Sequence, residues 1–355
     1  MKEIFTITLV IIGALIGAGF ASGQEVYSFF YSYGPIGIVG IIVTCSLMSL
    51  IIYKSLTIIC KMEINNYDEF LKVFIKNEKI TKAINVIINI LLLVTFYIMI
   101  AGFGAYFEQE IKIHRIIGSS LLAFLSAVIF FTSVKGVLKV SEYIVPILII
   151  FIIMIGGINL ISINTEIEIP VIKKGWFLSS VIYCSYNIIL LIPILISIRT
   201  QIKKTQNIKY ISILCGLIMI TISVLIYMLL IKVDVDISTL EMPIVYTIRK
   251  FFYKYKTIYA FIILASIFTT AISIGIGLLE NISENKKSYT QFVLFMCISS
   301  LVISNFGFSK LVNFVYPFFG YIGIIQLILL INAPKIPGPK GAVKDMQRLK
   351  MHRKY

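Results

Sequence analysis

A run of small residues followed by two polar ones interrupts the first apolar stretch of the chain, residues 4–31. It reads GALIGAGFASG from Gly13 to Gly23 and is followed directly by Gln24 and Glu25. Inside a membrane helix, each glycine costs about 1 kcal/mol relative to alanine, and a carboxylate costs more. Irregular backbone at membrane depth is tolerated where it lines a cavity, so this segment predicts an unwound first span beside a binding site.

An unwound segment exposes backbone groups of both signs. Its N–H groups, at the start of a half-helix, can bind an anion such as a carboxylate, and its free carbonyl groups can bind a monovalent cation. Other interpretations remain open, because Gly13 and Gly17 also have the GxxxG spacing of packed membrane helices. Glu25, the one carboxylate well inside the first span, either titrates with a proton or lies in a water-filled outer vestibule.

Hydroxyl side chains gather in a later apolar stretch, residues 257–279. Four of them lie close together: Ser266, Thr269, Thr270 and Ser273. They could supply neutral oxygen ligands, which hard cations such as Na⁺ prefer. The same hydroxyls could instead donate to carbonyl groups one turn back in their own helix. Beside a broken first span, they favour a cation site.

A third polar cluster lies in the stretch 176–198, which reads SSVIYCSYN from Ser179 to Asn187 and has Pro193 beyond it. When residues 1–161 and 176–332 are compared as two halves of the chain, this cluster lies where the glycine run lies in the first half. It therefore predicts a second interrupted span. The alternative is an ordinary helix whose serine and asparagine side chains bond neighbouring helices.

The elements that must hold these clusters are membrane helices. Of the 355 residues, 59% are hydrophobic and 14% are charged, and the mean hydropathy is +0.97. Apolar stretches long enough to span a bilayer recur about ten times. They cover 4–31, 35–59, 83–107, 115–133, 140–161, 176–198, 208–231, 257–279, 289–305 and 309–332. We therefore expect an all-α integral membrane protein with about ten transmembrane helices.

The net charge of +15 follows membrane topology and does not indicate a nucleic-acid partner. Lysine and arginine are concentrated in 61–82, 199–209 and the tail 333–355, which lie on one side if the spans alternate in direction. By the positive-inside rule, both termini are expected in the cytoplasm. The lipid bilayer is thus a predicted partner, and nucleic acid is not.

The apolar stretches divide into two halves, residues 1–161 and 176–332. In each half, a long connection with an amphipathic segment follows the second span, at 61–82 and 232–256. Because each half has an odd number of spans, the second must cross the membrane in the opposite direction. This is a five-plus-five inverted repeat in which spans one and six correspond. Similar loop spacing could also arise by chance.

The sequence holds no recognisable catalytic or metal-binding set. Its two histidines are His114 and His352, and its five cysteines show no CxxC spacing. The glycines that begin at Gly17 superficially match a dinucleotide motif, but no strand precedes them. We expect neither an enzyme nor a protein with a resident cofactor.

The residues of the interrupted span carry a resemblance to a known family. Residues 16–25, IGAGFASGQE, resemble the opening of the YkvI-type bacterial membrane proteins, and the similarity extends over nearly the whole chain in length and span pattern. That family more distantly resembles the amino acid–polyamine–organocation (APC) superfamily, whose members have a five-plus-five inverted repeat with broken helices one and six. The resemblance implies alternating access around a central site between those two helices.

The resemblance also implies site residues. The family's sodium ligands map onto the carbonyl groups of Gly13, Ile16 and Ser266 and the hydroxyls of Thr269 and Thr270. Its substrate-carboxylate site maps onto Gly17, Ala18 and Gly19, faced by Tyr183, Ser185 and Tyr186. Two positions depart from the wider pattern. Phe20 stands where some members have the asparagine of a second sodium site, and the pair Gln24–Glu25 is not typical.

Together these features predict a cation-coupled secondary transporter in the bacterial plasma membrane. The expected cargo is a small carboxylate-bearing solute, a neutral amino acid in the first instance. Na⁺ is the expected coupling ion, and H⁺ carried by Glu25 is the alternative. A hypothesis of another class is a receptor with a transporter fold, similar to germinant receptors, that binds a solute without net transport and signals to a protein partner. The identity of any protein partner stays open.

Overall fold

The structure is a computed structural model, and it describes residues 2–75, 77–132, 136–161, 171–282 and 286–333. Every regular element in these ranges is a helix. Nine of the described helices are long and apolar enough to cross a membrane, and Glu3–Leu15 forms a shorter apolar helix. The all-α integral membrane class is confirmed.

The helices follow one another as expected from the apolar stretches. Their bounds are α1 (Lys2–Leu15), α2 (Ala18–Ala21), α3 (Gln24–Phe29), α4 (Ile36–Lys61), α5 (Tyr67–Lys72), α6 (Glu78–Tyr106), α7 (Arg115–Thr132), α8 (Gly136–Ile161), α9 (Trp176–Ser197), α10 (Asn207–Leu230), α11 (Pro243–Phe251), α12 (Lys256–Ile282), α13 (Lys286–Ser304) and α14 (Phe308–Ile331). Short 3₁₀ and π turns join several of them.

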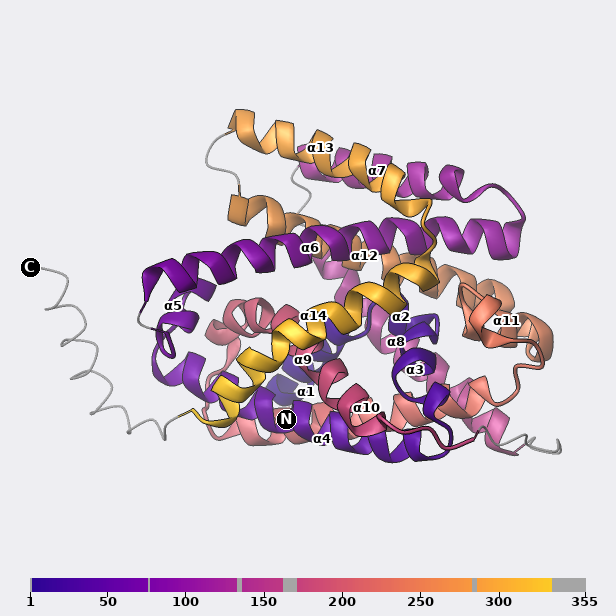
Figure 1. Ribbon diagram of the computed structural model, residues 1–355, viewed down its shortest axis with the longest axis horizontal. Helices are drawn as coiled ribbons and strands as arrows, with labels where there is room; N and C mark the ends of the chain where they lie inside the picture. Colours follow the sequence, from indigo (N-terminus) through magenta and orange to yellow (C-terminus); the bar gives the residue numbers. More distant parts are fainter. Residues whose placement is uncertain (1, 76, 133–135, 162–170, 283–285, 334–355) are drawn as a thin grey trace, which may run out of the picture.

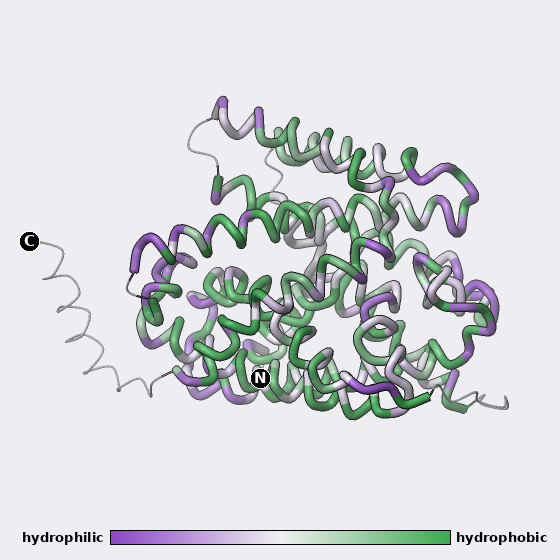
Figure 2. Tube along the Cα trace, in the orientation of Figure 1, coloured by the Kyte–Doolittle hydropathy of each residue, from purple (hydrophilic) through white to green (hydrophobic). Residues whose placement is uncertain are grey.

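The long helices lie side by side, and the pieces of the first span lie among them. Helix α9 packs against α14 and α4, α4 packs against α10, and α6 packs against α12 and α7 (Figure 1). Helices α7 and α13 form one edge of the bundle. Apolar residues cover the long helices, and hydrophilic residues gather at the two ends of the molecule (Figure 2). This distribution fits a bundle that crosses a bilayer from end to end.

The first span is interrupted, as its sequence predicts. Helix α1 ends at Leu15, α2 is a single turn, and α3 begins at Gln24. The second interruption needs glycine, because Gly23 has a φ of 83° and a side chain there would also overlap Ile244. The turn into α3 therefore depends on a residue that lacks a side chain, whereas Gly17, at the first interruption, has an extended backbone and open space around it.

The predicted break in the sixth span is wrong, because α9 is one continuous helix. Three of its polar side chains bond carbonyl groups of their own helix: Ser180 Oγ donates to Trp176 at 2.8 Å, Ser185 Oγ to Val181 at 2.7 Å and Asn187 Nδ2 to Tyr183 at 2.9 Å. Ser179 Oγ instead donates to the carbonyl of Phe29 in α3 at 2.8 Å. The helix contains no glycine, and Pro193 lies within it without ending it. Polar side chains that are satisfied locally leave the backbone ladder intact.

Each long connection holds a short helix. These are α5 and α11, which follow the second span of each proposed half. They lie at opposite ends of the molecule (Figure 1). The division into two halves and the orientation of the termini stay predictions, and residues 334–355 of the predicted basic tail lie outside the described residues.

Candidate binding site at the break in the first span

The centre of the site is the carboxyl group of Glu25, on the first turn of α3. Its side chain is 2% exposed. It lies directly over Gly19, where an added Cβ would overlap Glu25 Oε1. The glycine at position 19 therefore makes room for this carboxyl group, and the two breaks bring α2 and α3 close enough for the contact.

Two tyrosines of α9 hold the carboxyl group. Tyr183 Oη donates to Glu25 Oε2 at 2.9 Å, and Tyr186 Oη donates to the same oxygen at 2.6 Å. Their i, i+3 spacing places both on one face of the helix. None of the ion pairs among the described residues involves Glu25, so hydrogen-bond donors surround it without a compensating cation.

Aromatic rings enclose the two tyrosines. Tyr316 of α14 stacks on Tyr186 with ring centroids 4.6 Å apart, and Phe29 of α3 lies 5.0 Å from Tyr183 and 6.0 Å from Tyr186. All four side chains are buried. The wall of the site is therefore aromatic, with one carboxyl group within it.

Two glycines place α14 close enough for the Tyr186–Tyr316 stack. A Cβ at Gly320 would lie 2.6 Å from the carbonyl oxygen of Ile182, and one at Gly323 would lie 2.6 Å from that of Ser185. Real Cβ atoms do not approach so closely, so α14 can pack on α9 at this distance only with glycine at both positions. Small residues permit such contacts between membrane helices.

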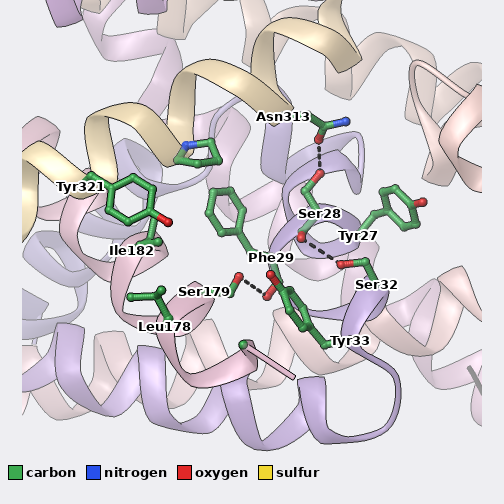
Figure 3. Close-up of a pocket in the computed structure, with 12 residues that line it drawn as sticks. Tyr27, Ser28, Phe29, Ser32, Tyr33, Leu178, Ser179, Ile182, Asn313 and Tyr321 are labelled. Carbon is green, nitrogen blue, oxygen red and sulfur yellow. Dashed lines mark hydrogen bonds between the residues drawn. The ribbon is translucent and has the colours of Figure 1, made fainter. Parts of the chain in front are cut away.

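A pocket of about 430 Å³ opens beside this cluster, between α3, the start of α9 and α14 (Figure 3). Its lining residues are all uncharged: Tyr27, Ser28, Phe29, Ser32, Tyr33, Gly175, Leu178, Ser179, Ile182, Asn313, Pro317 and Tyr321. Phe29 belongs both to the lining and to the ring cluster around Glu25. Glu25 and the three tyrosines of the cluster do not line the pocket, so Phe29 is the residue that the two regions share.

Helix α14 also forms hydrogen bonds with α3 beside the pocket. Gln24 Nε2 donates to Ser309 Oγ at 2.9 Å, and Ser28 Oγ donates to Asn313 Oδ1. The spacing of four residues on both helices aligns these pairs. Sequence reasoning did not name Ser309 or Asn313. Their spacing with Tyr316 puts all three near one helix face, a pattern that could have identified them.

The carbonyl groups after the first break are bonded. Ser22 accepts from the backbone N–H of Ile244 in α11 at 2.9 Å, Ala21 accepts from Tyr259 Oη of α12, and Gly19 accepts from Ser22 Oγ at 3.0 Å. Helices α11 and α12 therefore support the unwound segment from outside it.

The carbonyl groups before the break are different. In the described part of the chain, no hydrogen bond reaches the carbonyl oxygens of residues 13–16. Gly13 and Ile16, two of the predicted cation ligands, lie in this group. Free carbonyls at a helix end need a partner such as a ligand or water.

The predicted hydroxyl ligands lie on α12. Ser266 and Thr269 are buried, and Thr270 is half-buried. Thr269 Oγ1 donates to the carbonyl of Ser266 at 3.1 Å. Helix α12 packs against α2 but makes no hydrogen bond with Gly13 or Ile16 among the described residues. The sodium site therefore stays a prediction. No group of three or more His, Cys, Asp or Glu side chains that could hold a metal ion occurs in the described ranges.

The predicted substrate residues are only partly brought together. Gly17 has open space where a side chain would point, whereas the space over Gly19 is taken by Glu25. Tyr183 and Tyr186 face the break, but Ser185 turns to its own helix. Their roles toward a substrate stay predictions, and the structure adds that the carboxylate at Gly19 is the chain's own.

Comparison with known proteins gives two full-length relatives. The chain is 27% identical over 335 residues to the uncharacterized membrane protein YkvI of Bacillus subtilis, covering 93% of this chain and 96% of the relative. It is 26% identical over 333 residues to the uncharacterized protein YyaD of the same organism, covering 92% and 95%. No protein-family model matches. These similarities support the resemblance to YkvI-type membrane proteins; the wider relation to the APC superfamily stays a prediction.

Proposed function

We propose that this multi-pass membrane protein is a cation-coupled secondary transporter of a small solute, a neutral amino acid in the first instance. One observation carries the proposal: the broken first span holds a buried carboxyl group, Glu25, that has hydrogen-bond donors but no cationic partner in the described part of the chain. An intramembrane ionisable residue of this kind commonly marks a substrate or ion pathway.

The charge of Glu25 explains why a cation would be coupled to the cargo. A buried carboxylate is costly unless a cation or a proton compensates it. A zwitterionic amino acid has no net charge, so a bound Na⁺ or a proton on Glu25 would neutralise the loaded site. The carbonyl groups of Gly13 and Ile16, which lack donors among the described residues, support Na⁺ as the first ion to test.

The packing supports alternating access. When the halves are exchanged, the first span corresponds to α9, α4 to α10, α6 to α12 and α8 to α14. The contact of α9 with α4 then corresponds to that of α1 with α10, and the contact of α9 with α14 to that of α1 with α8. Helix α12 packs on α8 as α6 packs on α14. Each contact becomes its counterpart when the two halves are exchanged, which is the relation expected for an inverted repeat. Two halves related by a pseudo-two-fold axis can reach two states that open the central site to opposite sides of the membrane.

The test is solute flux by the purified full chain in proteoliposomes. Uptake of labelled amino acids is measured with an inward Na⁺ gradient, with an inward H⁺ gradient and with neither. We expect one gradient to drive accumulation, and Glu25→Gln to abolish it. Ser180→Ala is the matched control, because Ser180 is buried on α9, its hydroxyl bonds only its own helix, and it is not one of the predicted substrate residues. Solute binding without flux under any gradient would instead support a receptor.

A further inference from the structure

The surroundings of Glu25 differ from those of a site built to receive a carboxylate. The face of Gly19, which was expected to receive the carboxylate of the cargo, already holds the carboxyl group of Glu25. The donors that could bind a second carboxylate, Tyr183 Oη and Tyr186 Oη, are both used by the first. A cargo carboxylate at this place would meet a like charge in a buried region.

We propose that the cargo is recognised through a positively charged amino group, which binds Glu25 among the rings of Phe29, Tyr183, Tyr186 and Tyr316, and that the cargo needs no carboxylate. The inference rests on the proposed function and narrows its substrate class. It covers amino acids and also simple primary amines.

The hydrogen bonds favour a charged Glu25 that awaits a cation. Tyr183 Oη and Tyr186 Oη both donate to the same carboxyl oxygen, Glu25 Oε2. A proton on Oε2 would have to be donated to one of these hydroxyls, and that hydroxyl would then no longer donate to the carboxyl group. Two donors on one oxygen favour the charged form, and we infer that the partner it lacks is a positive charge.

The ring cluster favours an ammonium group over a bare metal ion at this place. Aromatic faces attract ammonium groups, and cages of such rings recognise amines in proteins. The rings of Phe29 and Tyr316 lie within 6.0 Å of the two tyrosines bonded to Glu25, so four aromatic rings gather around this carboxyl group. A bare Na⁺ would prefer several oxygen ligands, which the carbonyl groups of residues 13–16 offer on the other side of the break.

The pocket beside the site offers no charged partner for a carboxylate. None of its lining residues carries a lysine, arginine or histidine side chain. Aromatic and aliphatic groups dominate the lining, with serine and asparagine on one flank. A primary amine with an apolar tail complements this pocket, and Phe29 must move for the amine to reach Glu25.

The test compares matched triplets of probes on the purified full chain. Each triplet holds an amino acid, the amine without its carboxylate and the acid without its amine: leucine, isopentylamine and 4-methylpentanoate, then phenylalanine, phenethylamine and 3-phenylpropanoate. The measurement is the shift in melting temperature against probe concentration in NaCl and in choline chloride. Ligand at 100 times its Kd gives a clear shift.

We expect the amine and the amino acid of at least one triplet to stabilise the protein, and the acid not to. Glu25→Gln should weaken amine binding by about 100-fold, the scale for losing one partner of a buried charge pair. Tyr186→Phe should weaken it less, since it keeps the ring, and Ser180→Ala, which removes a hydroxyl that bonds only Trp176 of its own helix, should leave it unchanged. Glu25→Asp keeps the charge and should retain part of the binding, which separates loss of charge from loss of folding.

Three outcomes would overturn the inference. One is stabilisation by an acid and not by its amine. Another is amine binding that survives Glu25→Gln. The third is stabilisation by Na⁺ alone that disappears in Glu25→Gln, which would make Glu25 a ligand of the coupling ion. If any of these occurs while proteoliposomes still accumulate a solute, transport stands and amine recognition fails; if no probe binds and no gradient drives uptake, both fail.

Discussion

The first span and α9 both carry polar residues inside an apolar stretch, but only the first span is broken. In α9 the hydroxyl and amide groups of Ser180, Ser185 and Asn187 return to carbonyl groups of the same helix. In the first span, glycines allow the turn, and a carboxyl group folds back over one of them. Missing side chains, more than added polarity, therefore decide where a membrane helix unwinds.

The difference also assigns the two regions separate tasks. The broken span supplies Glu25 and free carbonyl groups before the break, while the intact helix supplies two tyrosines at a fixed spacing. A rigid helix can orient Tyr183 and Tyr186 accurately because its backbone has no freedom at that point. The charged group therefore lies on the irregular segment, and the hydrogen-bond donors that hold it lie on the regular helix α9.

The largest effect is expected from Gly19→Ala, which removes the space that Glu25 occupies. The added Cβ would overlap three atoms of the Glu25 side chain, so the carboxyl group must leave its tyrosine partners. Overpacking of this kind costs about 1–3 kcal/mol, and solute binding should be lost as well. The measurements are melting temperature and ligand binding of the purified variant.

A second substitution tests the cause of that loss. Glu25→Asp shortens the side chain, so the double variant Gly19→Ala/Glu25→Asp should recover part of the stability that Gly19→Ala loses. If the double variant is less stable than either single variant, the overlap of the new Cβ with Glu25 does not explain the loss of stability.

A smaller effect is expected from Gly23→Ala, at the second break. A residue with a side chain pays about 1–2 kcal/mol in the left-handed region that Gly23 adopts at a φ of 83°. The new Cβ also meets the side chain of Ile244. Ile244→Ala in the same chain should relieve the contact but not the backbone cost, so partial recovery of the melting temperature is expected. Complete recovery would show that φ imposes no strain there.

The smallest effect is expected in α9. Ser185→Ala removes a hydroxyl that bonds only Val181 of the same helix, and such local bonds contribute little. We expect a stability change within about 0.5 kcal/mol and unchanged uptake. A large loss of uptake would mean that Ser185 faces the solute in another state of the protein, and the contrast between the two regions would weaken.

The sequence was sufficient for the fold class and for the first break. Hydropathy located the spans, and the glycines of residues 13–23 predicted the unwinding because their conformational effect is local. It was not sufficient for α9, since a serine that bonds its own helix cannot be distinguished by sequence from one that bonds a neighbour. Tyr183 and Tyr186 were named only through the family resemblance.

The partner of those tyrosines depended on tertiary packing. That Glu25 lies over Gly19 follows from the angle between α2 and α3, which no local pattern encodes. Tyr316 reaches the cluster because Gly320 and Gly323 let α14 approach α9. Such close contacts become visible only once the helices are assembled.

The central claim is that the charge of Glu25 receives the positive group of the cargo. Infrared difference spectroscopy of the reconstituted protein, with and without an amine or amino acid found to bind, tests it most directly. We expect cargo binding to change a carboxylate stretching band in the wild type, and that change to be missing from Glu25→Gln and present in Ser180→Ala. Saturating cargo binding with no Glu25-dependent change in the carboxylate bands would contradict the claim.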